Sequence, residues 1–249
     1  MLPTIVRRPR TAEDTAQGAR IAKMDKRDIG PADVARVLNS ARLKYVLVGA
    51  HAANGYLGRP RNTVDVDVVV PFPKKATTAL AAAFPDLSIV DSPVVTRFKL
   101  PNGNEAIGVM KPTGSPLWKE LLRITKSIRV DGVPIQIPPL EGVLAAKFAA
   151  MVSPWRRPLD KQQDGLDFAR MISVNERVDE SLLESLAERI FEGGGKEVLK
   201  LLADARAGRR LEQPTFRLFT DHRFDELGEV AGAILAGLGR NEGTDSAGR

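Results

Sequence analysis

Short apolar runs alternate with polar turns and amphipathic segments along the first half of this chain. Residues 45–48 are continuously apolar and predict a strand. In the strand predicted at 64–70, Val64, Val66 and Val68 share one face, and Val69 and Val70 extend it into a buried run typical of a sheet covered on both sides. Helices are expected to begin at Pro31 and at Pro73, because proline suits the first position of a helix. A further short helix is expected between the two strands.

Two hairpins are expected after these elements. Residues 94–100 and 106–110 flank the turn sequence Pro-Asn-Gly-Asn, and residues 127–130 and 133–137 flank Asp-Gly. The order of helix, strand, helix, strand, helix and two hairpins predicts an α/β (α+β) protein, in which helices flank a mixed sheet.

The second half of the chain is predicted to be helical from Leu140 onward. Gly193-Gly194-Gly195 is expected to separate two amphipathic helices, and a last helix is expected near residues 225–238. These patterns divide the chain into four predicted parts: a flexible basic tail (1–30), a core (31–150), a helical subdomain (151–238) and a disordered tail (239–249).

Two carboxylates stand in the second apolar strand. Asp65 and Asp67 are two residues apart, and side chains at positions i and i+2 of a strand point to the same face. Because carboxylates in so apolar a strand are costly unless they are solvated or bound to a cation, the pair indicates a divalent-metal site. Upstream, Gly49 and Ala50 open a helix whose backbone N–H groups and dipole favour a phosphate group.

These residues resemble a known family in their order and spacing. The sequence Val48-Gly49-Ala50, followed by Arg61-x-Thr63-x-Asp65-x-Asp67, is similar to the pattern of the DNA polymerase β-like nucleotidyltransferases. The turn Gly49-Ala50-His51-Ala52 resembles the small bacterial branch related to the toxins of abortive-infection and toxin–antitoxin systems. The helix that carries Lys147 and the segment Lys161-x-x-Asp164-x-x-Asp167 resemble two further motifs, so the resemblance covers roughly residues 32–172.

The resemblance implies a reaction and a set of site residues. The implied reaction transfers a nucleoside monophosphate from a nucleoside triphosphate (NTP) to an acceptor hydroxyl and releases pyrophosphate. The implied catalytic residues and metal ligands are Asp65 and Asp67, which would hold Mg²⁺ or Mn²⁺. The implied nucleotide-binding residues are Gly49, Ala50, Arg61, Thr63, Lys147, Lys161 and Asp164.

Several of these residues also have a purely structural interpretation. Arg61 either binds the triphosphate or pairs with the two aspartates, and Thr63 can simply begin a strand. Lys147 lies in an otherwise apolar helix, where either its stem follows the core or its ammonium group reaches phosphate. Lys161 and Asp164 can act as helix-terminal charges alone.

One position departs from the family pattern. The family's third catalytic carboxylate comes from a neighbouring strand, and here Gly108 occupies that position. Glu105 is the obvious substitute, but regular alternation places it with the apolar residues Ile107 and Val109, unless a bulge interrupts the strand. Asp164 is the other substitute. The alternative function is therefore a catalytically degenerate protein that binds a nucleotide or a partner, in a regulatory or antitoxin-like role.

The composition limits the metal chemistry and the class of protein. The chain has 249 residues, of which 43% are hydrophobic, and this suits one globular domain with an appendage. Because it has no cysteine and two histidines, a metal is expected to have mainly oxygen ligands, as Mg²⁺ and Mn²⁺ prefer. No segment has the apolar length of a membrane span or a signal-peptide core, so a cytoplasmic location and no membrane partner are expected.

The net charge of +6 favours polyanionic partners. The expected partners are the nucleotide, an RNA acceptor such as tRNA and, from the toxin resemblance, a cognate antitoxin protein. The segment Trp155-Arg156-Arg157 either contacts an acceptor nucleic acid or forms a basic linker between two subdomains. A basic RNA-binding module without chemistry is a third interpretation.

Overall fold

The computed structural model describes residue 17, residues 29–209 and residue 211. Contacts divide the chain into two compact units, residues 1–214 and 215–249, and every described residue belongs to the first unit. The helix predicted at 225–238 and the tail predicted at 239–249 lie outside the described residues, as does most of the tail predicted at 1–30. The domain boundaries drawn from the sequence remain predictions.

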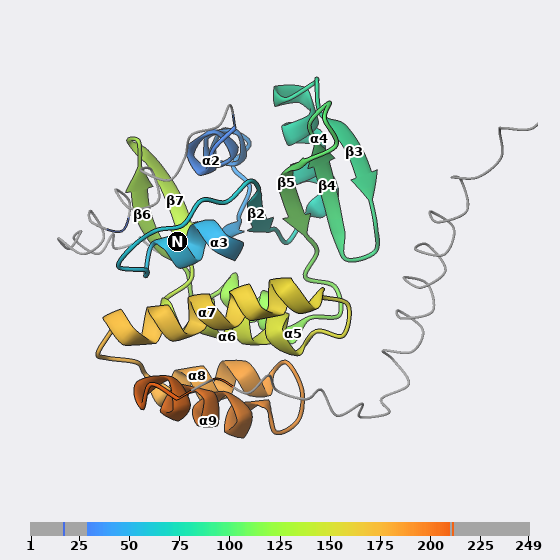
Figure 1. Cartoon of the computed structure of the whole chain (residues 1–249). Coiled ribbons are helices and arrows are strands. Elements are labelled where there is room, and N and C mark those ends of the chain that lie inside the picture. Colours follow the sequence, from blue (N-terminus) through green and yellow to red (C-terminus); the bar gives the residue numbers. More distant parts are fainter. Residues whose placement is uncertain (1–16, 18–28, 210, 212–249) are drawn as a thin grey trace, which may run out of the picture. The chain divides into compact units, whose positions relative to one another are not determined.

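The main sheet has five strands in the order β1-β2-β5-β4-β3 (Figure 1). These strands are β1 (Val46–Leu47), β2 (Val66–Val69), β3 (Ser88–Asp91), β4 (Val95–Lys99) and β5 (Glu105–Met110). Strands β2 and β5 are parallel, whereas the other neighbouring pairs are antiparallel. Strands β6 (Lys126–Val130) and β7 (Val133–Ile137) form a separate hairpin, and β7 contacts β1.

Three helices are interleaved with these strands along the chain. Helices α2 (Pro31–Ser40) and α4 (Pro73–Ala83) contact each other, and they also contact β7 and β5, respectively. Helix α3 (Gly49–Asn54) contacts β2, which it precedes in sequence. A mixed sheet with helices packed against it is the α/β class that the sequence predicts, and that prediction is confirmed.

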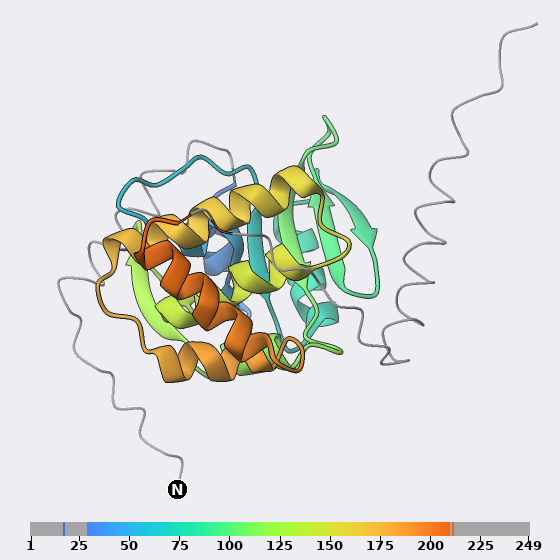
Figure 2. The ribbon, with the colours of Figure 1, turned by 60° about the horizontal axis from the view of Figure 1, so that its bottom comes forward.

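The remaining helices of the described chain gather on one side of the sheet, as the two views show together (Figures 1 and 2). They are α5 (Pro116–Leu121), α6 (Leu140–Val152), α7 (Pro158–Val174), α8 (Glu180–Glu188) and α9 (Gly194–Arg206). Helix α6 is apolar on nearly all sides and contacts α3, α7 and α8, so it joins the sheet layer to the helical group. None of the helices in the described part of the chain combines the length and apolar character that a bilayer crossing requires.

The details differ from the sequence pattern in a few places. Both predicted hairpins are present, as β4–β5 and β6–β7. Strand β2 begins at Val66, later than predicted, and Val64 is exposed, so Asp65 lies just before the strand. The pattern does not predict β3 or α5. All four residues of β3 are exposed, and an exposed edge strand has no burial alternation from which to recognise it.

Strand β5 carries a bulge. Two consecutive residues of β4 pair with Ile107 and Glu105, so Ala106 is an extra residue on β5. Without it, Glu105 would share the buried face of Ile107. With it, Glu105 lies on the same face as Gly108, since a Cβ atom added to Gly108 would be 3.2 Å from Glu105 Oε1.

Candidate metal and nucleotide site

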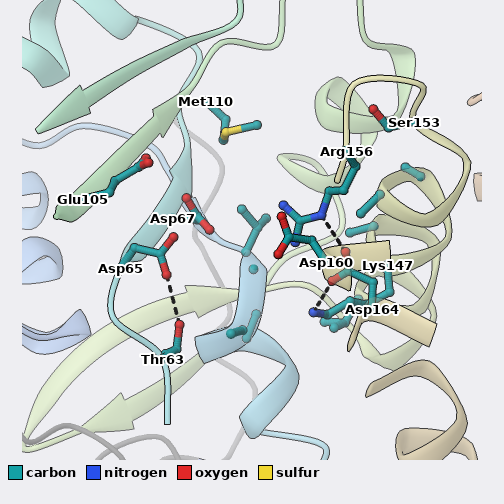
Figure 3. Close-up of a pocket in the computed structure, with 18 of the residues that line it drawn as sticks. Thr63, Asp65, Asp67, Glu105, Met110, Lys147, Ser153, Arg156, Asp160 and Asp164 are labelled. Carbon is teal, nitrogen blue, oxygen red and sulfur yellow. Dashed lines mark hydrogen bonds and ion pairs between the residues drawn. The ribbon is translucent and has the colours of Figure 1, made fainter. Parts of the chain in front are cut away.

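A cavity of about 900 Å³ lies between the sheet and helices α6 and α7. Three acidic side chains gather on the sheet side, and a mixed group of charged side chains faces them from the helical side (Figure 3). The sheet side carries Asp65, Asp67 and Glu105, and the helical side carries Lys147, Arg156, Asp160 and Asp164.

The three carboxylates on the sheet side converge. Asp65, Asp67 and Glu105 each offer an oxygen, and these oxygens all lie within 4.8 Å of one another. Two ligands of one Mg²⁺, each at about 2.1 Å, are at most about 4.2 Å apart, so small side-chain rotations close the cluster around one ion. The donors are all oxygen atoms, as the composition predicts, and the cluster therefore fits a hard divalent cation.

Two glycines make room for the Asp67 carboxylate. Gly49 has a φ of +65°, and a Cβ atom added there would lie closer than 3.0 Å to Asp67 Oδ2. Gly108 pairs directly with Asp67 across β2 and β5, and a Cβ atom there would lie closer than 3.0 Å to Asp67 Oδ1. Gly108 supplies no ligand, but its missing side chain leaves the space into which Asp67 and Glu105 extend.

The cluster concentrates negative charge. Burial, and then the charges of Asp65 and Glu105, raise the pKa of Asp67 to about 8. The pKa of Glu105 is also raised, mainly by burial. Arg97, whose Nε donates to Glu105 Oε2 at 3.1 Å, offsets part of this rise. Asp65 accepts a hydrogen bond from Thr63 Oγ1 at 3.0 Å. Within the described residues no lysine or arginine forms an ion pair with Asp65 or Asp67, so a bound cation would supply the compensating charge.

Lys147 and Arg61 are held in a buried ion-pair network. Lys147 Nζ donates to Asp164 Oδ1 at 2.8 Å and to Asp167 Oδ2 at 2.7 Å, and the lysine is 5% exposed. Arg61 Nε donates to the two oxygens of Asp167 at 3.2 and 3.0 Å. Arg61 therefore pairs with Asp167 and not with the aspartates of the metal cluster. Asp164 likewise stays in this network, and Glu105 is the third carboxylate of the cluster.

The other predicted nucleotide-binding residues are divided between the cavity and the outside. Gly49, Ala50 and Thr63 line the cavity, whereas Lys161 lies on α7 outside the residues that line it. Arg156 and Arg157 also line the cavity, and the sequence does not distinguish one from the other. They differ in their partners, because Arg156 pairs with the buried Asp164, whereas Arg157 pairs with Asp160, three residues along the chain.

Arg156 is electrostatically connected to both sides of the cavity. Its Nε donates to Asp164 Oδ2 at 2.7 Å. Burial lowers the pKa of its guanidinium, but the hydrogen bond and charge of Asp164, followed by the charges of Asp160 and Asp67, raise it above its ordinary value overall. The charge of Arg156 in turn lowers the pKa of Asp67, which the carboxylate neighbours raise.

No protein-family model matches the chain, and no curated protein matches it by sequence. Solved structures that resemble it include an antigenic nucleotidyltransferase-like protein from Paracoccidioides brasiliensis, with 18% identity, 74% of this chain and 93% of that chain covered, and a TM-score of 0.47. A second is ANT(2″)-Ia in complex with adenylyl-2″-tobramycin, which is 15% identical, with 70% of this chain and 94% of that chain covered and a TM-score of 0.41. A third is JHP933 from Helicobacter pylori, which is 19% identical, with 83% of this chain and 90% of that chain covered and a TM-score of 0.40.

Proposed function

We propose that this protein is a divalent-metal-dependent nucleotidyltransferase, which transfers a nucleoside monophosphate from an NTP to an acceptor hydroxyl. The observation that carries the proposal is the convergence of Asp65, Asp67 and Glu105 within 4.8 Å, in a cavity of about 900 Å³. The Gly49 turn, whose glycine conformation leaves space for Asp67, lies beside the cluster in the same cavity.

The cluster fits Mg²⁺ or Mn²⁺, which Asp65, Asp67 and Glu105 would hold. Such an ion, when bound, neutralises phosphate charge and stabilises the charge that develops during displacement. The backbone N–H groups at Gly49 and Ala50, which begin α3, would bind phosphate oxygens next to it.

In the proposed reaction, the acceptor oxygen forms a bond to the α-phosphorus of the NTP. The bond from that phosphorus to the bridging oxygen breaks, and pyrophosphate leaves with the electron pair. The hydroxyl proton passes to a carboxylate oxygen of the cluster. Placing both reactants in one cavity converts a bimolecular step into an effectively intramolecular one.

The proposal is tested by label transfer. The purified protein is incubated with Mg²⁺, each α-labelled NTP in turn and a set of acceptors, and labelled acceptor is measured. We expect transfer by the natural protein and a loss of at least about 100-fold in Asp67→Asn, because one metal ligand becomes a neutral amide. Asp86→Asn is the matched control, since Asp86 is exposed and lies outside the cavity. Transfer that survives Asp67→Asn would exclude this mechanism.

The acceptor class follows from charge and from the sequence resemblance. The net charge of +6 favours a polyanionic acceptor, so we propose RNA, with tRNA as the first substrate to test. One structural neighbour was solved in complex with adenylyl-2″-tobramycin, so tobramycin is the comparison arm of the assay. The toxin-like role and a cognate antitoxin are proposed from the sequence resemblance, and they predict growth inhibition on expression that a co-expressed partner relieves.

The degenerate alternative depended on the missing carboxylate at position 108. The position of Glu105 in the cluster, in the space that Gly108 leaves open, supports the catalytic proposal over that alternative. Metal-dependent NTP binding without label transfer to any acceptor would restore it.

A further inference from the structure

Five basic side chains line the cavity, and they are not equally available to a ligand. They are Arg61, Arg97, Lys147, Arg156 and Arg157. Lys147 is buried against two carboxylates, and Arg61 is held by Asp167. Arg97 pairs with Glu105, a member of the metal cluster. Three of the five are therefore already engaged in ion pairs at the wall of the cavity.

Arg157 is also engaged, in an ion pair that is largely exposed to solvent. Its Nε and Nη2 donate to the two carboxylate oxygens of Asp160, at 2.8 and 3.2 Å, and its side chain is 83% exposed. This pair joins the residue before α7 to the first turn of that helix. It is a local surface contact that any helix start can have.

Like Arg97, Arg156 uses only one edge of its guanidinium, but its partner, Asp164, lies outside the metal cluster. Its Nε donates to Asp164, and the two terminal nitrogens carry four further N–H groups. Among the described residues no hydrogen bond from those four groups is present. Its side chain is 43% exposed, and in Figure 3 it stands across the cavity from Asp67.

Asp164 holds Arg156 in this orientation. Asp164 is almost completely buried and uses one oxygen for each neighbour, Oδ1 for Lys147 and Oδ2 for Arg156. Lys147 is also bonded to Asp167, so the carboxylate is fixed from the core side. An arginine anchored in this way loses little side-chain entropy when it binds a ligand.

We propose that Arg156 is the side chain that binds the phosphate groups of the nucleotide, through its two terminal nitrogens, and that Asp164 positions it. The metal cluster and Arg156 form opposite sides of one cavity, so a phosphate chain between them would meet cationic groups on both sides. A planar guanidinium matches two oxygens of a phosphate group with two parallel hydrogen bonds. This inference rests on the proposed function, because it assumes that the cavity takes a triphosphate.

The test uses inorganic tripolyphosphate with Mg²⁺ as a probe, so that base preference does not enter. Its dissociation constant is measured by calorimetry for the full-length natural protein and for Arg156→Ala. We expect an affinity roughly 10- to 100-fold weaker in Arg156→Ala, as for the loss of charge-assisted hydrogen bonds. Arg156→Lys should recover only part of the affinity, because lysine keeps the charge but not the paired geometry.

Arg157→Ala is the matched control, with the same residue type at the adjacent position. It should weaken tripolyphosphate binding by less than about 3-fold, since its partner is a surface carboxylate. Equal losses of tripolyphosphate affinity in Arg157→Ala and Arg156→Ala would mean that the probe responds to positive charge in general and not to Arg156. That result would overturn the assignment.

Asp164 is tested through Arg156 by a double-mutant cycle. Asp164→Asn should weaken tripolyphosphate binding in the natural background and have little further effect in Arg156→Ala, whereas a merely structural role would weaken both backgrounds equally. Circular dichroism confirms that each variant is folded. If the natural protein binds the probe and Arg156→Ala binds it equally well, this inference is wrong and the proposed function stands. If the natural protein does not bind Mg²⁺ and tripolyphosphate at all, the proposed function fails first.

Discussion

Replacing Gly108 by alanine tests the metal cluster without removing a carboxylate. The added Cβ atom would lie closer than 3.0 Å to Asp67 Oδ1 and 3.2 Å from Glu105 Oε1. To restore an ordinary contact, the Asp67 carboxylate must retreat by up to roughly 1 Å. Mg²⁺ requires near-ideal octahedral geometry at about 2.0–2.1 Å, so a displacement of this size disrupts the ligand set.

The same substitution should barely change the stability of the fold. The φ of Gly108 lies outside the left-handed region, so alanine fits the backbone and stabilises by about 0.4–1 kcal/mol through the unfolded chain. Rotating a carboxylate away from its preferred rotamer costs about 0.5–1.5 kcal/mol. The two effects nearly cancel, and the midpoint of thermal unfolding should shift by no more than about 4 °C.

The assay combines label transfer with thermal unfolding in the presence and absence of Mg²⁺. Gly108→Ala should lose about 100-fold in transfer rate, as for other displacements of about 1 Å at a reacting centre. Gly165→Ala is the control, because its added Cβ atom would meet only Met151 Cε, at 3.7 Å. If Gly108→Ala keeps both the natural transfer rate and the natural response to Mg²⁺, the three carboxylates do not act as one site.

Three further predictions concern the same region. Gly49→Ala and Gly103→Ala both place alanine at a positive φ, +65° and +83°, so each should lower the free energy of unfolding in urea by about 1–2 kcal/mol. Only Gly49→Ala also displaces Asp67, so only that variant should lose transfer activity. Lys147→Met leaves two buried carboxylates without their shared cation, so urea unfolding should show a loss of about 3–5 kcal/mol, and a change below 1 kcal/mol would argue against a structural role for this lysine. Asp67→Asn relieves repulsion, so in calorimetry with a chelator it should be about 0.5–2 kcal/mol more stable than the natural protein. Mg²⁺ at 100 times its dissociation constant should stabilise the natural protein by about 2.7 kcal/mol and the variant much less.

Much of the fold could be predicted because its signals are local. Continuous apolar runs, proline at helix starts and the two turn sequences depend on neighbouring residues, and each predicts one element of the observed sheet or its helices. The Gly49 turn lies beside Asp67 because β1 pairs with β2, and Val48 N–H donates to the Asp67 carbonyl oxygen at 2.9 Å. The sequence predicts both strands, but their pairing is a contact between separate segments. The β3 edge could not be predicted in this way, since its exposed residues carry no burial pattern.

The composition of the site was decided by tertiary structure. Side-chain parity along a single strand puts Glu105 in the core, and only the register between β4 and β5, with Ala106 as the extra residue, turns it toward Asp67. Whether a lysine or arginine faces a ligand or a buried carboxylate depends on how α6 packs against α7. Local sequence patterns therefore establish the two aspartates and the strand beside them, whereas the third carboxylate and the available cation depend on contacts between segments far apart in the chain.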